Sequence, residues 1–175
     1  MTIEVGAGDR PGVWPVYDAV FGDQPDEATW REAVWDRHVA RDGFRLAVAV
    51  ADGSDGSDGS DGGSLDGFGY GYTGEHGQWW TDQVARTLPR DVATAWLGGH
   101  FELVSIGVLP RARRRGLGRA LMRALVDGVP HERLLLMTTD DAGDPARRLY
   151  AAEGWTVLGP GVGEHTVVMG RAAAR

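Results

Sequence analysis

The second half of the chain alternates short hydrophobic runs with segments in which apolar residues recur every three or four positions. The runs predict strands, and the spaced segments predict helices. The expected strands are Glu102 to Leu109, Arg133 to Thr138, Trp155 to Leu158 and His165 to Met169, and the expected helices are Gly116 to Asp127 and Asp144 to Ala152, the latter with Asp144 as its N-cap. This order predicts an α/β fold around a mixed sheet.

The first half of the chain predicts a β-hairpin. Phe44 to Ala51 is an apolar run of strand length, and Gly67 to Thr73 alternates aromatic residues with glycine, which is typical of a partner strand. A short strand at Ile3 to Val5 and helices at Trp14 to Phe21 and Glu27 to Val39 are expected before the hairpin.

Two segments differ from this pattern. Residues 52–64 form a Ser-Asp-Gly repeat that has no closing Glu of a calcium loop, so they predict a flexible loop. Residues 75–100 carry apolar positions at helical spacing, broken by Pro89, and predict an inserted helical segment that forms a cavity wall or packs on the core. Because 175 residues is an ordinary length for one domain, we expect a single domain over residues 1–175.

The composition excludes several kinds of chemistry. The chain has no cysteine, which excludes disulfides, thiolate metal sites and cysteine nucleophiles, and it has no lysine, which excludes Schiff-base catalysis. No apolar run reaches the length of a membrane span, and the first residues lack the pattern of a secretory signal. The expected location is the cytoplasm, with no membrane partner.

The charge is unevenly distributed along the chain. Residues 1–100 hold 7 Arg and 17 acidic residues (7 − 17 = -10), whereas residues 101–175 hold 11 Arg and 8 acidic residues (11 − 8 = +3). An anionic ligand is therefore expected to bind to the second half. The net charge of -7 and the shortness of the basic cluster argue against nucleic acid as a partner.

The strongest candidate for an anion site is the run Arg-Arg-Arg-Gly-Leu-Gly from Arg113 to Gly118, between a predicted strand and a predicted helix. Free amides and the helix dipole favour phosphate at such a position, and Arg111 adds a further cation. The glycine spacing of a Rossmann site and the lysine of a Walker loop are both absent. A multiply charged phosphate is the expected ligand.

Two motifs of this chain resemble those of the GNAT (Gcn5-related N-acetyltransferase) superfamily. Val108-Leu109-Pro110 followed by Arg113-x-x-Gly116-x-Gly118 resembles the acetyl-CoA signature, and Ala146 to Tyr150 with Gly154-Trp155 resembles the second motif. The resemblance implies a mixed, mainly antiparallel central sheet flanked by helices, with splayed fourth and fifth strands. It also implies acetyl-CoA as the co-substrate.

The resemblance further implies which residues bind acetyl-CoA. Backbone groups near Ile106 and Val108 would pair with the pantetheine, with the amide of Val108 facing the thioester oxygen, and amides from Arg113 to Gly118 would hold the pyrophosphate. The implied cofactor-binding residues are Ile106, Gly107, Val108, Arg113, Arg114, Arg115, Gly116, Leu117, Gly118 and Arg119.

The implied catalytic residues are Tyr150 and Glu102. Tyr150 matches the tyrosine that protonates the leaving thiolate, and Glu102 matches a position at which some family members carry a general-base glutamate. Glu75, His76 and His100 are alternative bases on the acceptor side. No metal is expected, since the histidines are scattered and the family chemistry requires none.

The expected function is direct transfer of an acetyl group from acetyl-CoA to a primary amine, and the alternative is a non-catalytic CoA-binding or sensing domain. A small cationic amine is the favoured acceptor, and a peptide N-terminus or lysine is also cationic. Two observations support a cationic acceptor: the acidic first half, and an aromatic-lined cavity expected from Trp79, Trp80, Trp96, Tyr70 and Tyr72. The pattern is compatible with a homodimer formed through edge strands.

Overall fold

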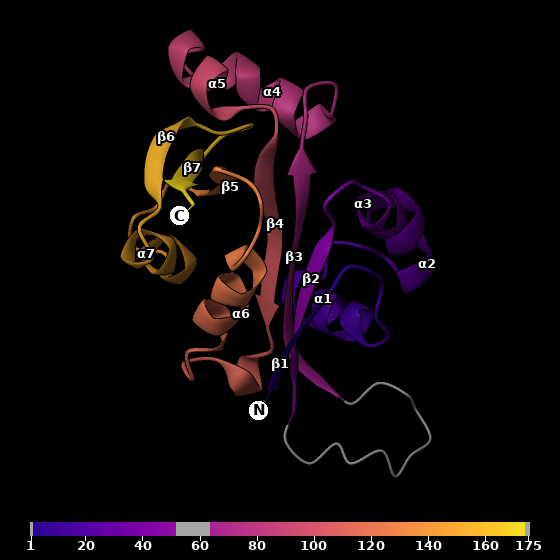
Figure 1. The fold of residues 1–175 in the computed structure, drawn as a ribbon. Coiled ribbons are helices and arrows are strands. Elements are labelled where there is room, and N and C mark those ends of the chain that lie inside the picture. The colour runs from indigo at the N-terminus through magenta and orange to yellow at the C-terminus, as the bar shows by residue number, and fades with distance from the viewer. Residues whose placement is uncertain (1, 52–63, 174–175) are drawn as a thin grey trace. The chain divides into compact units, whose positions relative to one another are not determined.

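The sheet is the central feature of the computed structural model, which describes residues 2–51 and 64–173 (Figure 1). Seven strands follow the order β1-β2-β3-β4-β5-β7-β6. The sheet is mainly antiparallel, β4 and β5 run parallel, and helices flank it. The predicted α/β fold with a mixed, mainly antiparallel sheet is therefore confirmed.

The chain divides into two compact units, residues 1–72 with 105–127 and residues 73–104 with 128–175. The first unit contains β1 (Thr2–Gly6), α1 (Val13–Phe21), α2 (Glu27–Trp30), the π-helical turn η1 (Arg31–Trp35), α3 (Asp36–Val39), β2 (Arg45–Val50), most of β3 (Leu65–Gly74), the end of β4 (His100–Val108), the 3-10 turn η2 (Pro110–Ala112) and α6 (Leu117–Val126). The second unit contains the end of β3, α4 (Trp79–Thr87), α5 (Arg90–Trp96), the start of β4, β5 (Arg133–Thr139), α7 (Pro145–Ala152), β6 (Thr156–Pro160) and β7 (Thr166–Ala172). The single domain expected from the chain length stays a prediction.

The hairpin expected in the first half is present. β2 and β3 pair antiparallel, with Leu46 opposite Tyr70 and Val48 opposite Phe68. The Ser-Asp-Gly repeat that connects the two strands, expected to be a flexible loop, lies outside the described residues except for Ser64.

Glycine and aromatic residues alternate along β3, so the glycines lie on one face of the strand and the aromatic side chains on the other. Gly67 and Gly69 face α6, and a Cβ at residue 69 would lie only 2.9 Å from Cδ1 of Leu125. Tyr70 faces the opposite side, where its ring lies edge-on to that of Trp35 at a centroid distance of 5.2 Å. The glycines let α6 pack directly on the strand backbone, and the aromatic residues fill the other face.

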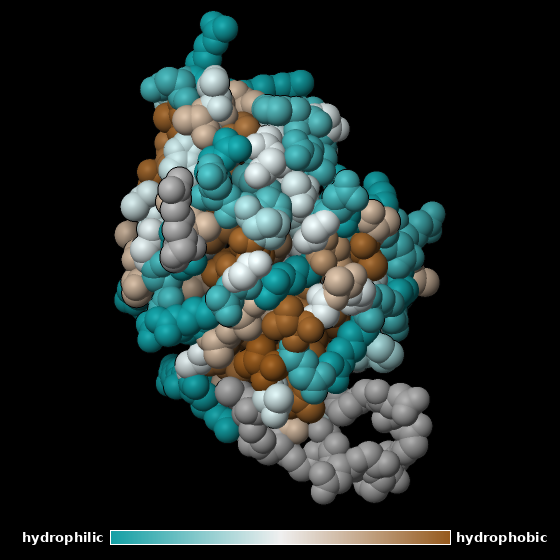
Figure 2. Space-filling model, viewed as in Figure 1, coloured by the Kyte–Doolittle hydropathy of each residue, from teal (hydrophilic) through white to brown (hydrophobic). Residues whose placement is uncertain are grey.

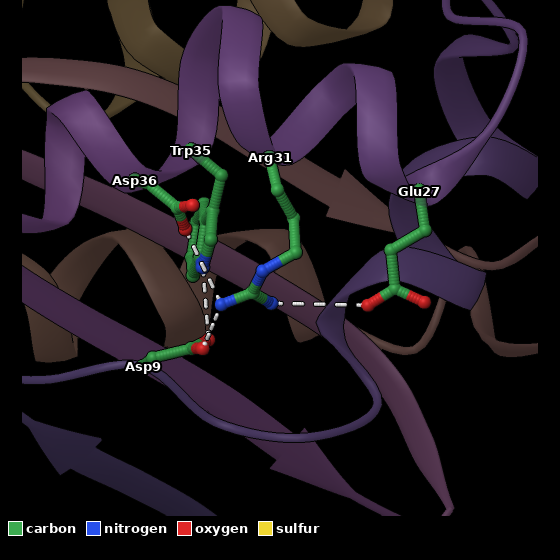
Figure 3. A network of polar contacts seen from close by, with 5 residues as sticks. All are labelled: Asp9, Glu27, Arg31, Trp35 and Asp36. Carbon is green, nitrogen blue, oxygen red and sulfur yellow. Dashed lines mark hydrogen bonds and ion pairs between the residues drawn. The ribbon is translucent and has the colours of Figure 1, made fainter.

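The predicted helix from Glu27 to Val39 contains the π-helical turn η1, which the sequence did not indicate. Figure 3 shows the contacts that this turn makes: the indole of Trp35 donates to Oδ1 of Asp9 at 2.8 Å, and Arg31 also binds Asp9. Arg31 lies 3.3 Å from a carboxylate oxygen of Asp36 as well. These contacts attach the segment before α1 to the turn.

In the second unit, α4 and α5 occupy the segment for which inserted helices were expected, and Pro89 separates them. Both helices pack on a buried cluster that consists of Val84, Leu88, Leu97, Leu135 and Val168, with Trp80 and Trp96 among the partly buried side chains against it. The segment is thus a helix pair packed on a hydrophobic core.

The pairing of β4 with β5 is confined to the start of β4. Phe101 lies opposite Leu134 and Glu102 opposite Leu135, and no further pair joins these two strands among the residues described. The strands therefore separate after Glu102, which agrees with the splayed fourth and fifth strands that were expected.

The face of the molecule shown in Figure 2 is mainly hydrophilic, and hydrophobic residues gather in the lower middle of this view. Among the residues that the structure describes, the exposed large hydrophobic side chains are Val5, Phe21, Trp79 and Val157. Within the described ranges, no helix has both the length and the apolar character needed to cross a membrane.

Candidate functional site

The loop that leads into α6 has a backbone suited to anion binding. Arg114 and Gly116 both adopt left-handed conformations, with φ of 61° and 78°. Gly116 is the N-cap of α6, and in the part of the chain that the structure describes no side-chain cap hydrogen bond is present at this end of the helix. Because the first amides of a helix have no intrahelical acceptor, those of Leu117 and Gly118 remain available to a ligand.

The arginines of this loop fall into two groups. Nε of Arg111 donates to Oδ1 of Asp66 at 3.0 Å, and Nε of Arg113 donates to the carbonyl of Val108 at 3.1 Å. Arg114 and Arg115 are exposed and form no ion pair with a carboxylate among the described residues. Arg111 is thus held by the protein itself, and Arg114 and Arg115 are the cations available to an anionic ligand.

The end of β4 presents backbone groups on the side away from β3. The amide of Leu109 donates to the carbonyl of Asp66 in β3 at 2.9 Å. Since successive amides of a strand point to opposite edges, the amide of Val108 points away from β3. Gly107, the residue before Val108, has no room for a side chain, because a Cβ would lie 2.9 Å from Cε1 of Phe68.

Glu102 lies in the part of β4 that belongs to the second unit, and it is buried. Its side chain is 4% exposed, and it lies opposite Leu135 in the β4–β5 pair. A carboxylate so removed from water, at the point where two strands separate, is suited to accept a proton from a substrate.

The three alternative bases have less suitable surroundings. His100 is fully buried, and its Nδ1 accepts a hydrogen bond from the amide of Gly98 at 3.1 Å. Burial, with a further contribution from the charge of Arg133, lowers the pKa of His100 to about 3, so the ring is neutral and a weak base. Glu75 and His76 are exposed to solvent.

Tyr150 lies in α7, where it is buried beside Trp155 at a ring centroid distance of 6.3 Å. Burial, together with the negative charge of Asp144, raises the pKa of Tyr150 to about 12. The phenol therefore keeps its proton at neutral pH. Asp144 caps α7 as predicted, accepting from the amides of Ala146 at 2.8 Å and Arg147 at 3.1 Å.

The remaining predicted side chains are placed differently from the expectation. Trp79 is 65% exposed, Trp96 packs against the hydrophobic cluster of the second unit, and Tyr70 packs against Trp35. These three residues do not support the aromatic-lined cavity. In the part of the chain that the structure describes, no three His, Asp or Glu side chains gather as metal ligands.

Comparison with known proteins identifies the family. Residues 63–155, more than half of the chain, match the Acetyltransferase (GNAT) family. The GCN5-like protein acetyltransferase of Mycobacterium tuberculosis is 34% identical over 147 residues, which cover 73% of this chain and 71% of that protein. The chain belongs to the GNAT family. The predicted resemblance is therefore confirmed, and the chain is an acyl-CoA-dependent N-acetyltransferase.

Solved GNAT structures share the fold at low sequence identity. A GNAT-family protein from Desulfovibrio desulfuricans is 18% identical with a TM-score of 0.65, over 99% of this chain and 100% of that one. The ribosomal-protein-S18-alanine N-acetyltransferase from Escherichia coli is 14% identical with a TM-score of 0.61, over 99% of this chain and 96% of that one. GNAT enzymes use acetyl-CoA as their co-substrate.

Sequence reasoning missed two polar residues of these regions, Asp66 and Thr81. Asp66 is 8% exposed and binds Arg111, a residue 45 positions away, so no local pattern indicates the contact. Thr81 is fully buried. Its position three residues before Val84, on the apolar side of a predicted helix, is the signal that was available.

Proposed function

We propose that this GNAT enzyme transfers the acetyl group of acetyl-CoA directly to a primary amine. The observation that carries the direct route is the absence of cysteine from the sequence. Without a thiol, the chain lacks the side chain best suited to form an acyl-enzyme, and attack by the amine on the thioester is the simpler path.

The first turn of α6 fits the diphosphate of acetyl-CoA. The amides of Leu117 and Gly118 have no side-chain cap, and the guanidinium groups of Arg114 and Arg115 are exposed. These hydrogen-bond donors and positive charges support the proposed diphosphate site. In the proposal, the remaining loop residues Arg113, Gly116 and Arg119 complete this site, and the backbone of Ile106, Gly107 and Val108 pairs with the pantetheine.

Glu102 is the proposed general base. An amine that arrives as ammonium must lose a proton before it attacks, and the buried carboxylate of Glu102 accepts that proton. The amine nitrogen then forms a bond to the thioester carbon. The oxyanion that develops on the carbonyl oxygen accepts a hydrogen bond from the amide of Val108.

Tyr150 is the proposed acid. When the carbon–sulfur bond breaks, the carbonyl re-forms, the electron pair of that bond stays on sulfur, and the phenol of Tyr150 donates its proton to the thiolate. The new amide nitrogen loses its extra proton, which restores the phenol of Tyr150. With a pKa of about 12, the phenol of Tyr150 carries its proton at the pH of the assay, so this proton is present when the thiolate forms.

A small cationic amine is the proposed acceptor. The balance of -10 charges over residues 1–100 (7 − 17) supports attraction of a cation. The relative from Mycobacterium tuberculosis is named a protein acetyltransferase, which supports an amine of a protein as the second candidate. The cytoplasmic location, the homodimer and the absence of a nucleic-acid partner stay predictions.

Calorimetric titration with acetyl-CoA, followed by a thiol-release assay at pH 8, tests the proposal. The acceptor panel holds small amines, aminoglycosides and lysine-containing peptides, so that the two acceptor classes are compared directly. Binding with turnover is expected, and binding without turnover on any acceptor would favour the CoA-sensing alternative.

Two substitutions test the proposed catalytic roles in the same assay. Glu102→Gln and Tyr150→Phe should each lower kcat by about 100-fold or more while leaving acetyl-CoA affinity unchanged, because each removes a proton transfer and no binding contact. The matched control is Glu75→Gln, which removes an exposed carboxylate. A kcat equal to that of the wild type in either variant rejects the corresponding role.

A further inference from the structure

Thr81 is a polar residue on the apolar side of α4. Its side chain is 0% exposed, and its hydroxyl is buried without a hydrogen-bond partner among the described residues. Helical threonines commonly bond the carbonyl one turn earlier, as Thr94 does with the carbonyl of Arg90 at 2.8 Å. A buried hydroxyl without a partner is destabilising, so its presence needs an explanation.

Helix α4 covers the face of the sheet that carries Glu102. Because Glu102 and Leu135 are paired in register, their side chains lie side by side on one face. Leu135 belongs to the same buried cluster as Val84 of α4. Thr81 lies one helical turn before Val84 and on the same side of the helix.

A second contact, between Trp80 and His100, places the residue before Thr81 against the same strand as Glu102. The ring of Trp80 lies 6.0 Å from that of His100, and His100 shares a strand face with Glu102, two positions later. Trp80, which precedes Thr81, therefore contacts His100, and Val84, one turn after Thr81, packs in the same cluster as Leu135. All these residues belong to the second unit.

We infer that Thr81 is a positioning residue for Glu102. Its hydroxyl binds one buried water, which donates a hydrogen bond to the carboxylate and holds it in the orientation that accepts the proton of the amine. The hydroxyl and the carboxylate supply two of the two to four polar partners that a buried water typically has. Thr81 touches no reacting atom and acts through Glu102, so this inference rests on the proposed role of Glu102 as the base.

Two variants of Thr81 distinguish the effect of its hydroxyl on kcat from the effect of its size and shape. Thr81→Val replaces the hydroxyl with a methyl group at nearly constant volume, and Thr81→Ser keeps the hydroxyl. We expect Thr81→Val to lower kcat about tenfold with unchanged acetyl-CoA affinity, and Thr81→Ser to retain most of kcat. Thr94→Val, which removes a hydroxyl from the neighbouring helix, should leave kcat unchanged.

A double-mutant cycle with Glu102→Gln identifies the route through which Thr81 acts. If the hydroxyl acts through the carboxylate, Thr81→Val has no further effect on kcat in the Glu102→Gln background. An equal fall in both backgrounds overturns the inference and leaves the role of Glu102 intact, whereas wild-type kcat in Glu102→Gln overturns the proposed base itself.

The same cycle measured by thermal unfolding needs no acceptor amine. The Tm shifts of Thr81→Val and Glu102→Gln should be non-additive, because both side chains bind the same water. Additive shifts overturn the inference whether or not a substrate has been found.

Discussion

The imidazole ring of His100 occupies the space that a side chain at residue 74 would need. A Cβ added to Gly74 would lie 2.9 Å from Cδ2 of the ring and closer still to Nε2 and Cε1. Because Nδ1 of the same ring accepts from the amide of Gly98, His100 joins the end of β3 to the turn that precedes β4. The ring thus fixes the start of the strand that carries Glu102.

Gly74→Ala should lower the free energy of unfolding by about 1–3 kcal/mol, because the new methyl group and the buried ring compete for the same space. Chemical denaturation measures the change. Gly6→Ala is the matched control, since a Cβ at residue 6 meets no heavy atom within 4 Å. Equal stability of both variants would show that the ring moves aside at little cost.

The stability of the protein should fall as the pH drops from 6.5 to about 4, and His38 contributes to this fall. Burial, with smaller contributions from the charges of Arg41 and Arg37, lowers the pKa of His38 to about 4. Between that value and the ordinary pKa of about 6.5, the unfolded chain binds a proton that the folded protein does not, so acid favours unfolding.

His38→Gln should make the dependence of unfolding free energy on pH shallower in this window. Glutamine does not titrate, yet it can hydrogen-bond Tyr70, whose hydroxyl lies 3.0 Å from Nδ1 of His38. Denaturant midpoints at pH 4, 5, 6 and 7 provide the measurement. An unchanged slope would show that His38 is not responsible.

Asp144→Ala should destabilise the protein by about 1 kcal/mol, since the carboxylate accepts two amide hydrogen bonds at the start of α7. Asp144→Ser is the matched control because serine is also a good N-cap, and it should recover most of the loss. Thermal unfolding compares the three proteins, and the prediction fails if alanine and serine behave alike.

Replacing both Arg114 and Arg115 with Gln should raise the Kd for acetyl-CoA about tenfold or more and weaken its dependence on salt, because two exposed cations at the proposed diphosphate site are lost. Calorimetry at two salt concentrations measures both effects. The control changes Arg86 and Arg90, which are exposed in the second unit, to Gln and alters the net charge equally. Equal Kd changes in the two double variants would indicate a general charge effect.

The sequence predicted those features that depend on local pattern. The alternation in β3, the cap at Asp144 and the glycines before α6 depend on neighbouring residues, and the structure has each of them. Features that depend on distant contacts were not predictable in this way. The partner of Arg111 is 45 residues away.

The tryptophans show the same limit of local pattern. Trp79 and Trp96 both fit a helical apolar pattern, yet one is 65% exposed and the other packs on the core. The side of a helix that is buried depends on the sheet beneath it. The spacing of Thr81 from Val84 is a local signal, but it indicates burial only once the buried side of the helix is known.

The close packing of α6 on Gly67 and Gly69 links two properties that are usually considered separately. Helix α6, whose first turn is proposed to hold the cofactor, can lie this close to β3 only because the two glycines of the strand have no side chains. A larger residue at either glycine would displace the helix axis and carry the loop with it. Random mutagenesis screened for altered cofactor affinity should therefore recover variants in β3, among residues that contact no ligand, as well as in the arginine loop.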